Sequence, residues 1–231
     1  MTTQNLASNL NAVRQQIRDS ESLYHRNEGE VCLIAASKTR SAEEIFELAA
    51  NGQLHFGENY VQEAVDKITE ITDIGLIWHF IGPIQKNKTK LIAQNFSWVH
   101  SIDRESVAVR LNNQRPSTLP ALNVCLQINI DNEISKSGIF PEDLLPLARS
   151  VEALPNLNLR GLMAIPSATK NFEQQSIAFK KMADLLKDLK EQKLDVDTLS
   201  MGMSNDYQAA IACGSTMVRI GTSIFGPRNY S

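Results

Sequence analysis

The sequence predicts an α/β protein of the (β/α)8, or TIM-barrel, class with one additional helix at its N-terminus. Eight short apolar segments recur along the 231 residues, helical patterns separate them, and no Pro-, Gly- or Ser-rich linker divides the chain. Strands that alternate with helical patterns indicate βαβ units and a parallel sheet, and eight such strands are enough to close a barrel. We therefore expect residues 1–231 to form a single domain, with an open doubly wound sheet as the alternative.

The first expected element is an amphipathic helix over about residues 3–25. Leu6, Leu10, Val13 and Ile17 recur at steps of four, three and four, which is the spacing of one helix face. Little sequence follows the eighth strand, so the outer ring of helices would lack its last member. We expect the N-terminal helix to fill that position.

The eight expected strands follow in order, each a short run dominated by apolar residues. They span residues 31–37, 54–58, 77–82, 98–102, 122–130, 158–165, 198–201 and 217–221. Two of the helices between them have clear signatures. Residues 41–51 open with a capping-box pattern, in which Ser41 is followed three positions later by Glu44. Residues 171–191 carry one apolar stripe, made of Phe179, Met182, Leu185, Leu186 and Leu189.

The composition excludes several classes of function. The net charge is -3 and the pI is near 5.8, which gives no electrostatic basis for binding nucleic acid. No apolar run approaches the roughly 18 residues that a membrane span needs, and the polar N-terminus lacks the apolar core of a signal peptide. We therefore expect a cytoplasmic protein that contacts neither membrane nor nucleic acid. Without a heptad seam, a monomer is the expected state.

The cysteines and histidines do not form a recognisable metal or disulfide framework. Three widely spaced cysteines are expected to be buried, reduced thiols, and they are Cys32, Cys125 and Cys213. Three histidines fall in separate strand segments, but no carboxylate-rich set accompanies them, so no metal site is expected. The four histidines are His25, His55, His79 and His100.

Lys38 follows the first expected strand, where the apolar run VCLIAAS ends. In a closed barrel the chemistry lies at the C-terminal ends of the strands, so this amine would face the mouth of the barrel. The seventh and eighth strands lead into Ser204, a natural N-cap for the helical stretch DYQAAIAC, and into Gly221 and Thr222. Barrels often bind phosphate in these last two loops.

A lysine amine and a phosphate site in one cavity fit a phosphorylated aldehyde, because an unprotonated lysine condenses with a carbonyl to give a Schiff base. Pyridoxal 5′-phosphate (PLP) has the required aldehyde, phosphate and flat ring. Each residue also has a structural alternative. Lys38 can be a surface lysine with a buried stem, Ser204 a helix cap only, Arg219 a structural ion pair, and Gly221 a turn residue.

Five segments in this order resemble the pyridoxal phosphate homeostasis family, also called the YggS/PROSC family: AASK, FGENYVQE, HFIGPIQKNK, SMGMSNDY and RIGTSIFG. The resemblance covers essentially the whole chain. It implies a barrel like the N-terminal domain of alanine racemase (fold type III), PLP as the cofactor, and a role in vitamin B6 and amino-acid metabolism. It also implies the cofactor-binding residues, which are Lys38 (Schiff base), Asn59, His79, Met201, Ser204, Arg219 (pyridine nitrogen), Gly221 and Thr222.

The resemblance implies binding without established catalysis, and the residues bear on that point. An arginine opposite the ring nitrogen only donates hydrogen bonds and weakens the electron sink that most PLP enzymes use. Racemisation stays an alternative, with Tyr60 and Tyr207 following strands two and seven, and so does a phosphate-binding barrel isomerase. Lys136, in the loop 131–139, is a second lysine that could reach the mouth. PLP-accepting apoenzymes or a regulatory protein are the expected partners.

Overall fold

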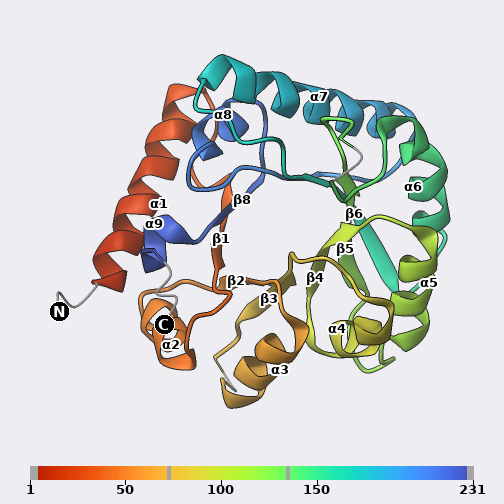
Figure 1. The fold of residues 1–231 in the computed structure, drawn as a ribbon, viewed down its shortest axis with the longest axis horizontal. Helices are drawn as coiled ribbons and strands as arrows, with labels where there is room; N and C mark the ends of the chain where they lie inside the picture. Colours follow the sequence, from red (N-terminus) through yellow and green to blue (C-terminus); the bar gives the residue numbers. More distant parts are fainter. Residues whose placement is uncertain (1–4, 72–73, 134–135, 228–231) are drawn as a thin grey trace.

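A computed structural model describes residues 5–71, 74–133 and 136–227. Its strands form one closed parallel barrel in the order β1 to β8 (Figure 1). The predicted barrel is confirmed. An open doubly wound sheet is wrong, because β1 pairs with β8 from Cys32–Met217 to Ala35–Ile220. The strands are β1 (Cys32–Ala36), β2 (His55–Glu58), β3 (Ile77–Phe80), β4 (Trp98–Ile102), β5 (Leu122–Ile128), β6 (Leu157–Ala164), β7 (Thr198–Ser200) and β8 (Met217–Ile220).

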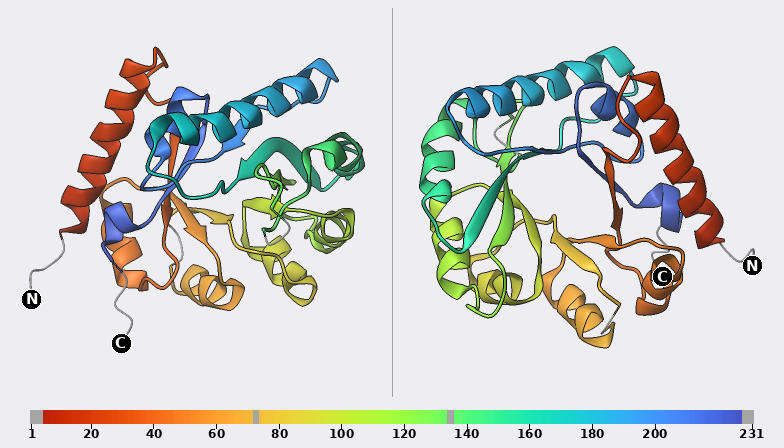
Figure 2. Two further views of the ribbon diagram at one scale, coloured as in Figure 1. Left: turned by 45° about the horizontal axis from the view of Figure 1, so that its top comes forward. Right: turned by 180° about the vertical axis from the view of Figure 1, so that it is seen from behind.

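Helices surround the barrel and cover its outer face (Figure 2). They are α1 (Leu6–Leu23), α2 (Ala42–Ala50), α3 (Val61–Glu70), α4 (Thr89–Asn95), α5 (Glu105–Gln114), α6 (Leu144–Glu152), α7 (Phe172–Glu191), α8 (Tyr207–Ala212) and α9 (Thr222–Phe225), with 3-10 turns η1 (Lys86–Lys88) and η2 (Pro141–Asp143). The predicted capping box of α2 is present, since Ser41 and Glu44 exchange side-chain and backbone hydrogen bonds. On α7 the predicted stripe faces inward, although Leu185 is only half-buried.

Helix α1 completes the outer ring beside α8 and α9, as predicted (Figures 1 and 2). Its four periodic apolar residues are buried, from Leu6 to Ile17. Two polar contacts tie the helix to the end of the chain. The Asn9 amide nitrogen donates to the Ile224 carbonyl at 2.9 Å, and the Tyr207 hydroxyl contacts Gln16 Oε1 at 3.1 Å. The first helix therefore supports both short helices that follow the last two strands.

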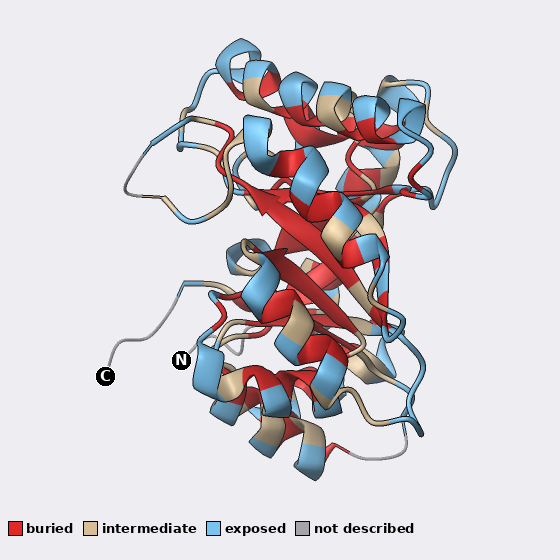
Figure 3. Cartoon of the chain, turned by 90° about the vertical axis from the view of Figure 1, so that its right-hand side faces the viewer, coloured by how far each residue is buried: buried red, intermediate tan, exposed pale blue. Residues whose placement is uncertain are grey.

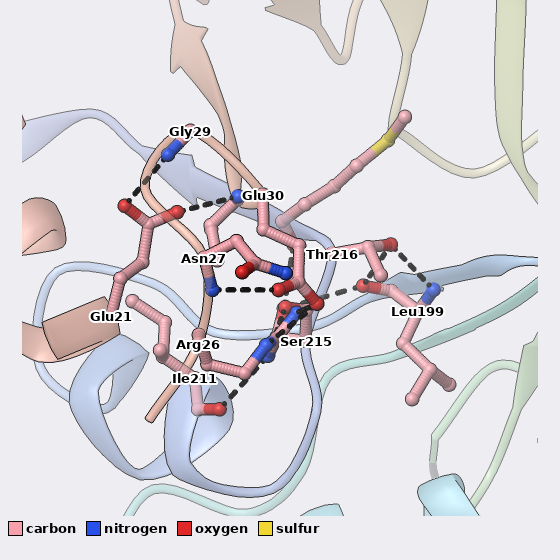
Figure 4. Close-up of polar contacts among 11 residues, drawn as sticks. Glu21, Arg26, Asn27, Gly29, Glu30, Leu199, Ile211, Ser215 and Thr216 are labelled. Atoms are coloured by element: carbon pink, nitrogen blue, oxygen red, sulfur yellow. Dashed lines mark hydrogen bonds and ion pairs between the residues drawn. The ribbon is translucent and has the colours of Figure 1, made fainter. Parts of the chain in front are cut away.

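The base of the barrel is closed by polar contacts between the α1–β1 connection and the residues before β8 (Figure 4). One Arg26 nitrogen donates to the carbonyls of Ile211 and Ser215, at 3.1 and 3.0 Å. The Glu21 carboxylate, although almost fully buried, accepts the Val31 N–H at 2.7 Å. These contacts start β1 next to β8, so the register of the closing pair is fixed from below.

Two apolar layers form the core. The larger one lies between the strands and the inward faces of the helices, where burial is continuous along the sheet (Figure 3). The smaller one lies inside the barrel, and it consists of Ile34, Trp98, Cys125, Met163 and Met217.

The barrel interior also contains buried polar side chains, among them His79, His100 and Arg219.

All three cysteines are free thiols, with Cys125 and Cys213 buried as predicted and Cys32 half-buried. Within residues 5–71, 74–133 and 136–227, no helix combines the length and apolar character that crossing a bilayer requires. The same residues contain no cluster of three or more His, Cys, Asp or Glu side chains arranged to bind a metal ion.

Candidate functional site

A cavity of about 840 Å³ opens at the C-terminal ends of the strands. Loops that follow β1, β2, β6, β7 and β8 contribute to its wall, as the fold class predicts. Six residues predicted from the sequence line it, and they are Lys38, Asn59, Ser204, Arg219, Gly221 and Thr222. The charged side chains on the wall are four cations and one carboxylate, which are Lys38, Arg40, Lys170, Arg219 and Asp206. The cavity is therefore suited to an anion.

The loop that carries Lys38 is fixed by its neighbours on both sides. Before it, the Ser37 carbonyl accepts a hydrogen bond from Lys67 Nζ at 2.9 Å. After it, the Thr39 N–H donates to Glu63 Oε1 at 2.6 Å, and Thr39 adopts a left-handed backbone with φ of 64°. Lys38 itself is half-buried. The backbone on either side of this lysine is thus held by contacts from α3.

A buried ion-pair cluster underlies this loop. Lys67 Nζ lies 2.9 Å from Glu58 Oε1 and 2.5 Å from Glu63 Oε1. The Ser37 hydroxyl adds a hydrogen bond to Glu58 at 2.7 Å. Burial raises the pKa of Glu58, and the adjacent Lys67 charge works against that rise without cancelling it. A buried pair of this kind is weak evidence for stability, but removal of one partner leaves a buried charge uncompensated.

Asn59 is held in the wall by a close backbone approach. A Cβ atom on Gly82 would lie 2.4 Å from the Asn59 carbonyl oxygen, so only glycine fits there. The Asn59 Oδ1 atom is buried, and among the described residues it has no hydrogen-bond partner. Because buried polar atoms are nearly always paired, this oxygen is available as an acceptor for a group that enters the cavity.

Arg219 is 4% exposed, and it reaches the cavity from β8. Its Nη1 atom donates to the Ser200 carbonyl at 2.6 Å and to the Ser200 hydroxyl at 2.7 Å, while Nη2 donates to the Ala164 carbonyl at 3.0 Å. Burial lowers the pKa of Arg219 to about 10, so the guanidinium is still charged at neutral pH. Contacts with the described residues use three of its five N–H groups, which leaves two for a ligand.

Ser204 lines the cavity, but its predicted role as a helix N-cap is wrong. Helix α8 begins at Tyr207, and Asp206 is its N-cap residue. The Asp206 carboxylate accepts the Met203 N–H at 2.6 Å and closes the turn that precedes the helix. Ser204 lies within that turn. The sequence alone could not distinguish the two, because serine and aspartate are both good N-cap residues.

Two residues implied by the family resemblance do not line the cavity. His79 is fully buried inside the barrel, hydrogen-bonded to other histidines, and Met201 is fully buried in the main apolar core. His79 lies within β3 and not in the loop that follows it, and Met201, directly after β7, packs into the main apolar core. Neither Tyr60, which is 55% exposed, nor Tyr207, which is buried against α1, is among the lining residues.

Lys136 is also absent from the cavity wall. Its Nζ atom lies 2.6 Å from Asp131 and 3.5 Å from Glu133, and it contacts Ser167. Desolvation alone would lower the pKa of Lys136, but the bond to Asp131 and the charges of both acids raise it overall. This lysine is therefore held as a protonated ion-pair partner.

Sequence reasoning missed the apolar walls and the support of the Lys38 loop. Ile81, Ile165 and Met203 add apolar surface to the cavity. Lys67 was missed because its partner Glu58 lies on a different element. The available signal was the i,i+4 pair of Glu63 and Lys67 on the helix that follows β2.

Comparisons with known proteins assign the family. Residues 3–229 match the family "Alanine racemase, N-terminal domain". The pyridoxal phosphate homeostasis protein of Haemophilus influenzae is 52% identical over 231 residues, covering 98% of both chains. The proteins of the same name from Pseudomonas aeruginosa and Escherichia coli K12 are 53% and 52% identical, each over at least 96% of both chains. The chain belongs to the pyridoxal phosphate homeostasis protein family. The predicted resemblance is thereby confirmed.

Solved structures agree with this family assignment. PipY of Synechococcus elongatus, in a structure with PLP bound, matches with a TM-score of 0.84 and 34% identity, over 96% of this chain and 100% of PipY. Alanine racemase of Corynebacterium glutamicum matches with a TM-score of 0.68 and 17% identity, over 96% of this chain and 62% of the racemase. The second match shows that the family shares its barrel fold with the racemase.

Proposed function

We propose that this protein binds PLP covalently through Lys38 and takes part in PLP homeostasis, with the whole chain as one binding domain. The observation that most strongly supports this proposal is that Lys38, Arg219 and Thr222 line one cavity, although they come from opposite ends of the sequence. The name shared by the curated relatives and the PLP held by PipY support the same function.

The residues present fit PLP. The predominance of cations in the wall suits its phosphate, the buried Asn59 Oδ1 offers an acceptor for a ring hydroxyl, and Ile81 and Ile165 suit the flat faces of the ring. When bound, PLP would supply an aldehyde as the electrophile for the amine of Lys38.

Each residue of the proposed site has a distinct role. Lys38 provides the amine that would join to the aldehyde of PLP. Arg219 donates to the pyridine nitrogen with the N–H groups that Ser200 and Ala164 leave unused. Ser204, Gly221 and Thr222 hold the phosphate through a hydroxyl, backbone N–H groups and a second hydroxyl. His79 and Met201 support the wall from behind it.

We propose that binding proceeds without efficient turnover. An arginine at the ring nitrogen favours the unprotonated ring, which is a poor electron sink. Racemisation needs an acid–base group on each face of the reacting carbon, and Tyr60 and Tyr207 do not line the cavity. A racemase assay on alanine and other amino acids is expected to give no rate above background. Turnover comparable to a dedicated racemase, and lost in Lys38→Ala, would overturn this proposal.

The protein is proposed to act as a cytoplasmic monomer that passes PLP to apoenzymes or contacts a regulatory protein. A cavity at the ends of the strands suits a carrier, because the cofactor must both enter and leave. Size-exclusion chromatography with light scattering tests the monomer, and transfer of PLP to an apo-transaminase tests the carrier role. A stable dimer, or transfer no faster than spontaneous release, would contradict these expectations.

The central test is reduction of the PLP-loaded protein with borohydride, followed by peptide mass spectrometry. We expect visible absorbance from the bound cofactor before reduction and a single phosphopyridoxyl adduct on Lys38 afterwards. A phosphate-binding isomerase, the alternative from the sequence besides a racemase, would bind inorganic phosphate and sugar phosphates without any lysine adduct. An adduct on another lysine would refute the assignment of Lys38.

A further inference from the structure

A line of buried hydrogen bonds runs through the barrel interior behind Arg219. The Ser200 hydroxyl, which accepts from Arg219, lies 2.7 Å from His100 Nδ1. His100 Nε2 lies 2.9 Å from His79 Nδ1, and His79 Nε2 lies 2.9 Å from His55 Nδ1. The residues come from β2, β3, β4, β7 and β8 in turn. We call these three histidines with Ser200 the histidine relay.

The three rings of the relay are neutral at pH 7. His79 and His100 are fully buried, and His55 is half-buried. Desolvation lowers the pKa of all three, strongly for His79, and to about 3 for His100, where the Arg219 charge adds to the effect. A neutral imidazole has one N–H donor and one acceptor nitrogen. In a line of such rings, each ring therefore accepts from one neighbour and donates to the next, and all of them donate in the same direction.

Arg219 fixes that direction. A guanidinium only donates, so the Ser200 oxygen is an acceptor in that bond. The Ser200 hydroxyl proton then goes to His100 Nδ1, because the reverse arrangement would leave a buried hydroxyl donor unpaired. It follows that His100 donates to His79 and that His79 donates to His55. All three rings then carry their proton on Nε2.

The line of hydrogen bonds connects two cavities. At one end of the relay, Ser200 binds Arg219, which lines the mouth cavity. His55, at the start of β2, lines a second cavity of about 430 Å³ near the N-terminal ends of β1 and β2, together with Arg14 and Cys32. The relay therefore crosses the barrel from its base to the proposed PLP site.

We propose that His55, His79 and His100 are positioning residues for Arg219, and that the relay carries a change in hydrogen bonding at His55 to the mouth cavity. The part that concerns PLP rests on the proposed function. The relay aligns the Ser200 hydroxyl as an acceptor, which holds one edge of the guanidinium and leaves its other N–H groups toward the cavity. The relay histidines do not line the mouth cavity, and they act on the proposed cofactor only through Arg219.

The first test needs no cofactor. Long-range 1H–15N spectra of PLP-free protein at pH 7 report which ring nitrogen of each histidine carries the proton. We expect the Nε2–H form for all three relay histidines, and none of them positively charged. His25, outside the relay at the end of α1, serves as an internal reference in the same spectrum. A proton on Nδ1 of His79 or His100, or a charged ring there, would refute the relay direction.

The second test changes the end of the relay that lies farthest from PLP. His55→Phe removes the acceptor, whereas His55→Asn keeps an acceptor near the Nδ1 position. We expect His55→Phe to shift the His100 ring resonances and to weaken PLP binding about two- to tenfold, as for one lost hydrogen bond. His55→Asn should restore most of the PLP affinity and bring the His100 ring resonances close to their original positions. His25→Phe should change neither the affinity nor the resonances. Unchanged His100 resonances and PLP affinity in a folded His55→Phe variant would overturn the coupling.

The two proposals fail in distinguishable ways. If borohydride traps no PLP on Lys38 but the histidines have the expected protonation pattern, the PLP site is wrong and the relay direction stands. If PLP is trapped on Lys38 but His55→Phe has no effect at His100, the PLP site stands and the coupling is wrong.

Discussion

Two loops at the mouth of the barrel each carry a lysine, and the carboxylates near the two loops pair with different lysines. Beyond β5, Lys136 itself pairs with Asp131 and Glu133. Beyond β1, Glu58 and Glu63 are engaged by a different lysine, Lys67. Lys38 lies in that loop and lines the cavity. The comparison teaches that acids near a mouth loop can bind its lysine directly, as for Lys136, or can hold the backbone on both sides of the lysine together with a second lysine from α3.

The largest expected effect separates the two lysines directly. Lys38→Ala should abolish the adduct trapped by borohydride and the visible absorbance of bound PLP, because the attacking amine is gone. Lys136→Ala, the matched control in the other loop, should keep both. Absorbance spectra and peptide mass spectrometry on the two variants provide the measurement. If Lys136→Ala loses the adduct and Lys38→Ala keeps it, the comparison is reversed.

Removing the cation of the buried ion-pair cluster beneath the Lys38 loop should lower the free energy of unfolding. Lys67→Met leaves the fully buried Glu58 without its cation, so we expect a loss of about 3–5 kcal/mol in the free energy of unfolding. Urea denaturation at pH 7 measures it. Lys187→Met, at an exposed pair with Glu191, is the control and should stay within about 0.5 kcal/mol of the parent. An equally small change for Lys67→Met would mean that the cluster does not hold the loop.

Glu58 and Asp131, the acids near the two loops, should contribute to the free energy of unfolding with opposite dependence on pH. The pKa of Glu58 is raised by burial, so the folded state binds its proton more tightly and this group lowers stability as pH rises above about 4.5. Glu58→Gln removes that dependence. Relative to the parent, the variant should therefore gain stability as pH rises from about 4.5 toward 7. Unfolding curves at several pH values check this, and a difference that does not vary with pH would contradict it.

Asp131, near the second loop, is the counterpart of Glu58, and its replacement has the smallest expected effect on stability. Burial would raise the pKa of Asp131, but its bonds to Lys136 and Ser167 lower it overall, so its stabilising contribution is present above about 3.8 and is lost below that pH. Since the pair is partly exposed, Asp131→Asn should cost less than about 1 kcal/mol. The cost should be constant between pH 5 and 7, where Glu58→Gln changes. A pH-dependent cost in that interval would argue against the assigned pair.

Much of the fold could be predicted because each buried strand is a short apolar run, and such runs can be identified along the chain. The capping box at Ser41, the apolar face of α1 and the position of that helix in the outer ring all follow from spacing along the chain. Strand ends follow within one or two residues, because the loops at the mouth begin where apolar runs stop.

The details of the site depend on partners far apart in sequence, which no local pattern reveals. The choice of Asp206 over Ser204 as N-cap depends on the turn at Met203. His79 faces the barrel interior because of strand alternation and register, and its partner His100 is 21 residues away. Lys67 was not identified for the same reason. Residues at strand ends could be predicted as a set, but not their individual contacts.

The place of α1 in the outer ring has a consequence for the order in which the chain is made. The helix is synthesised well before its partners α8 and α9, which end at residues 212 and 225. At about 5–20 residues per second, roughly 10–40 s of translation separate them. During that time the face formed by Leu6, Leu10, Val13 and Ile17 lacks the part of its native cover that α8 and α9 provide. Slow synthesis of the last quarter of the message should therefore increase aggregation of the nascent protein.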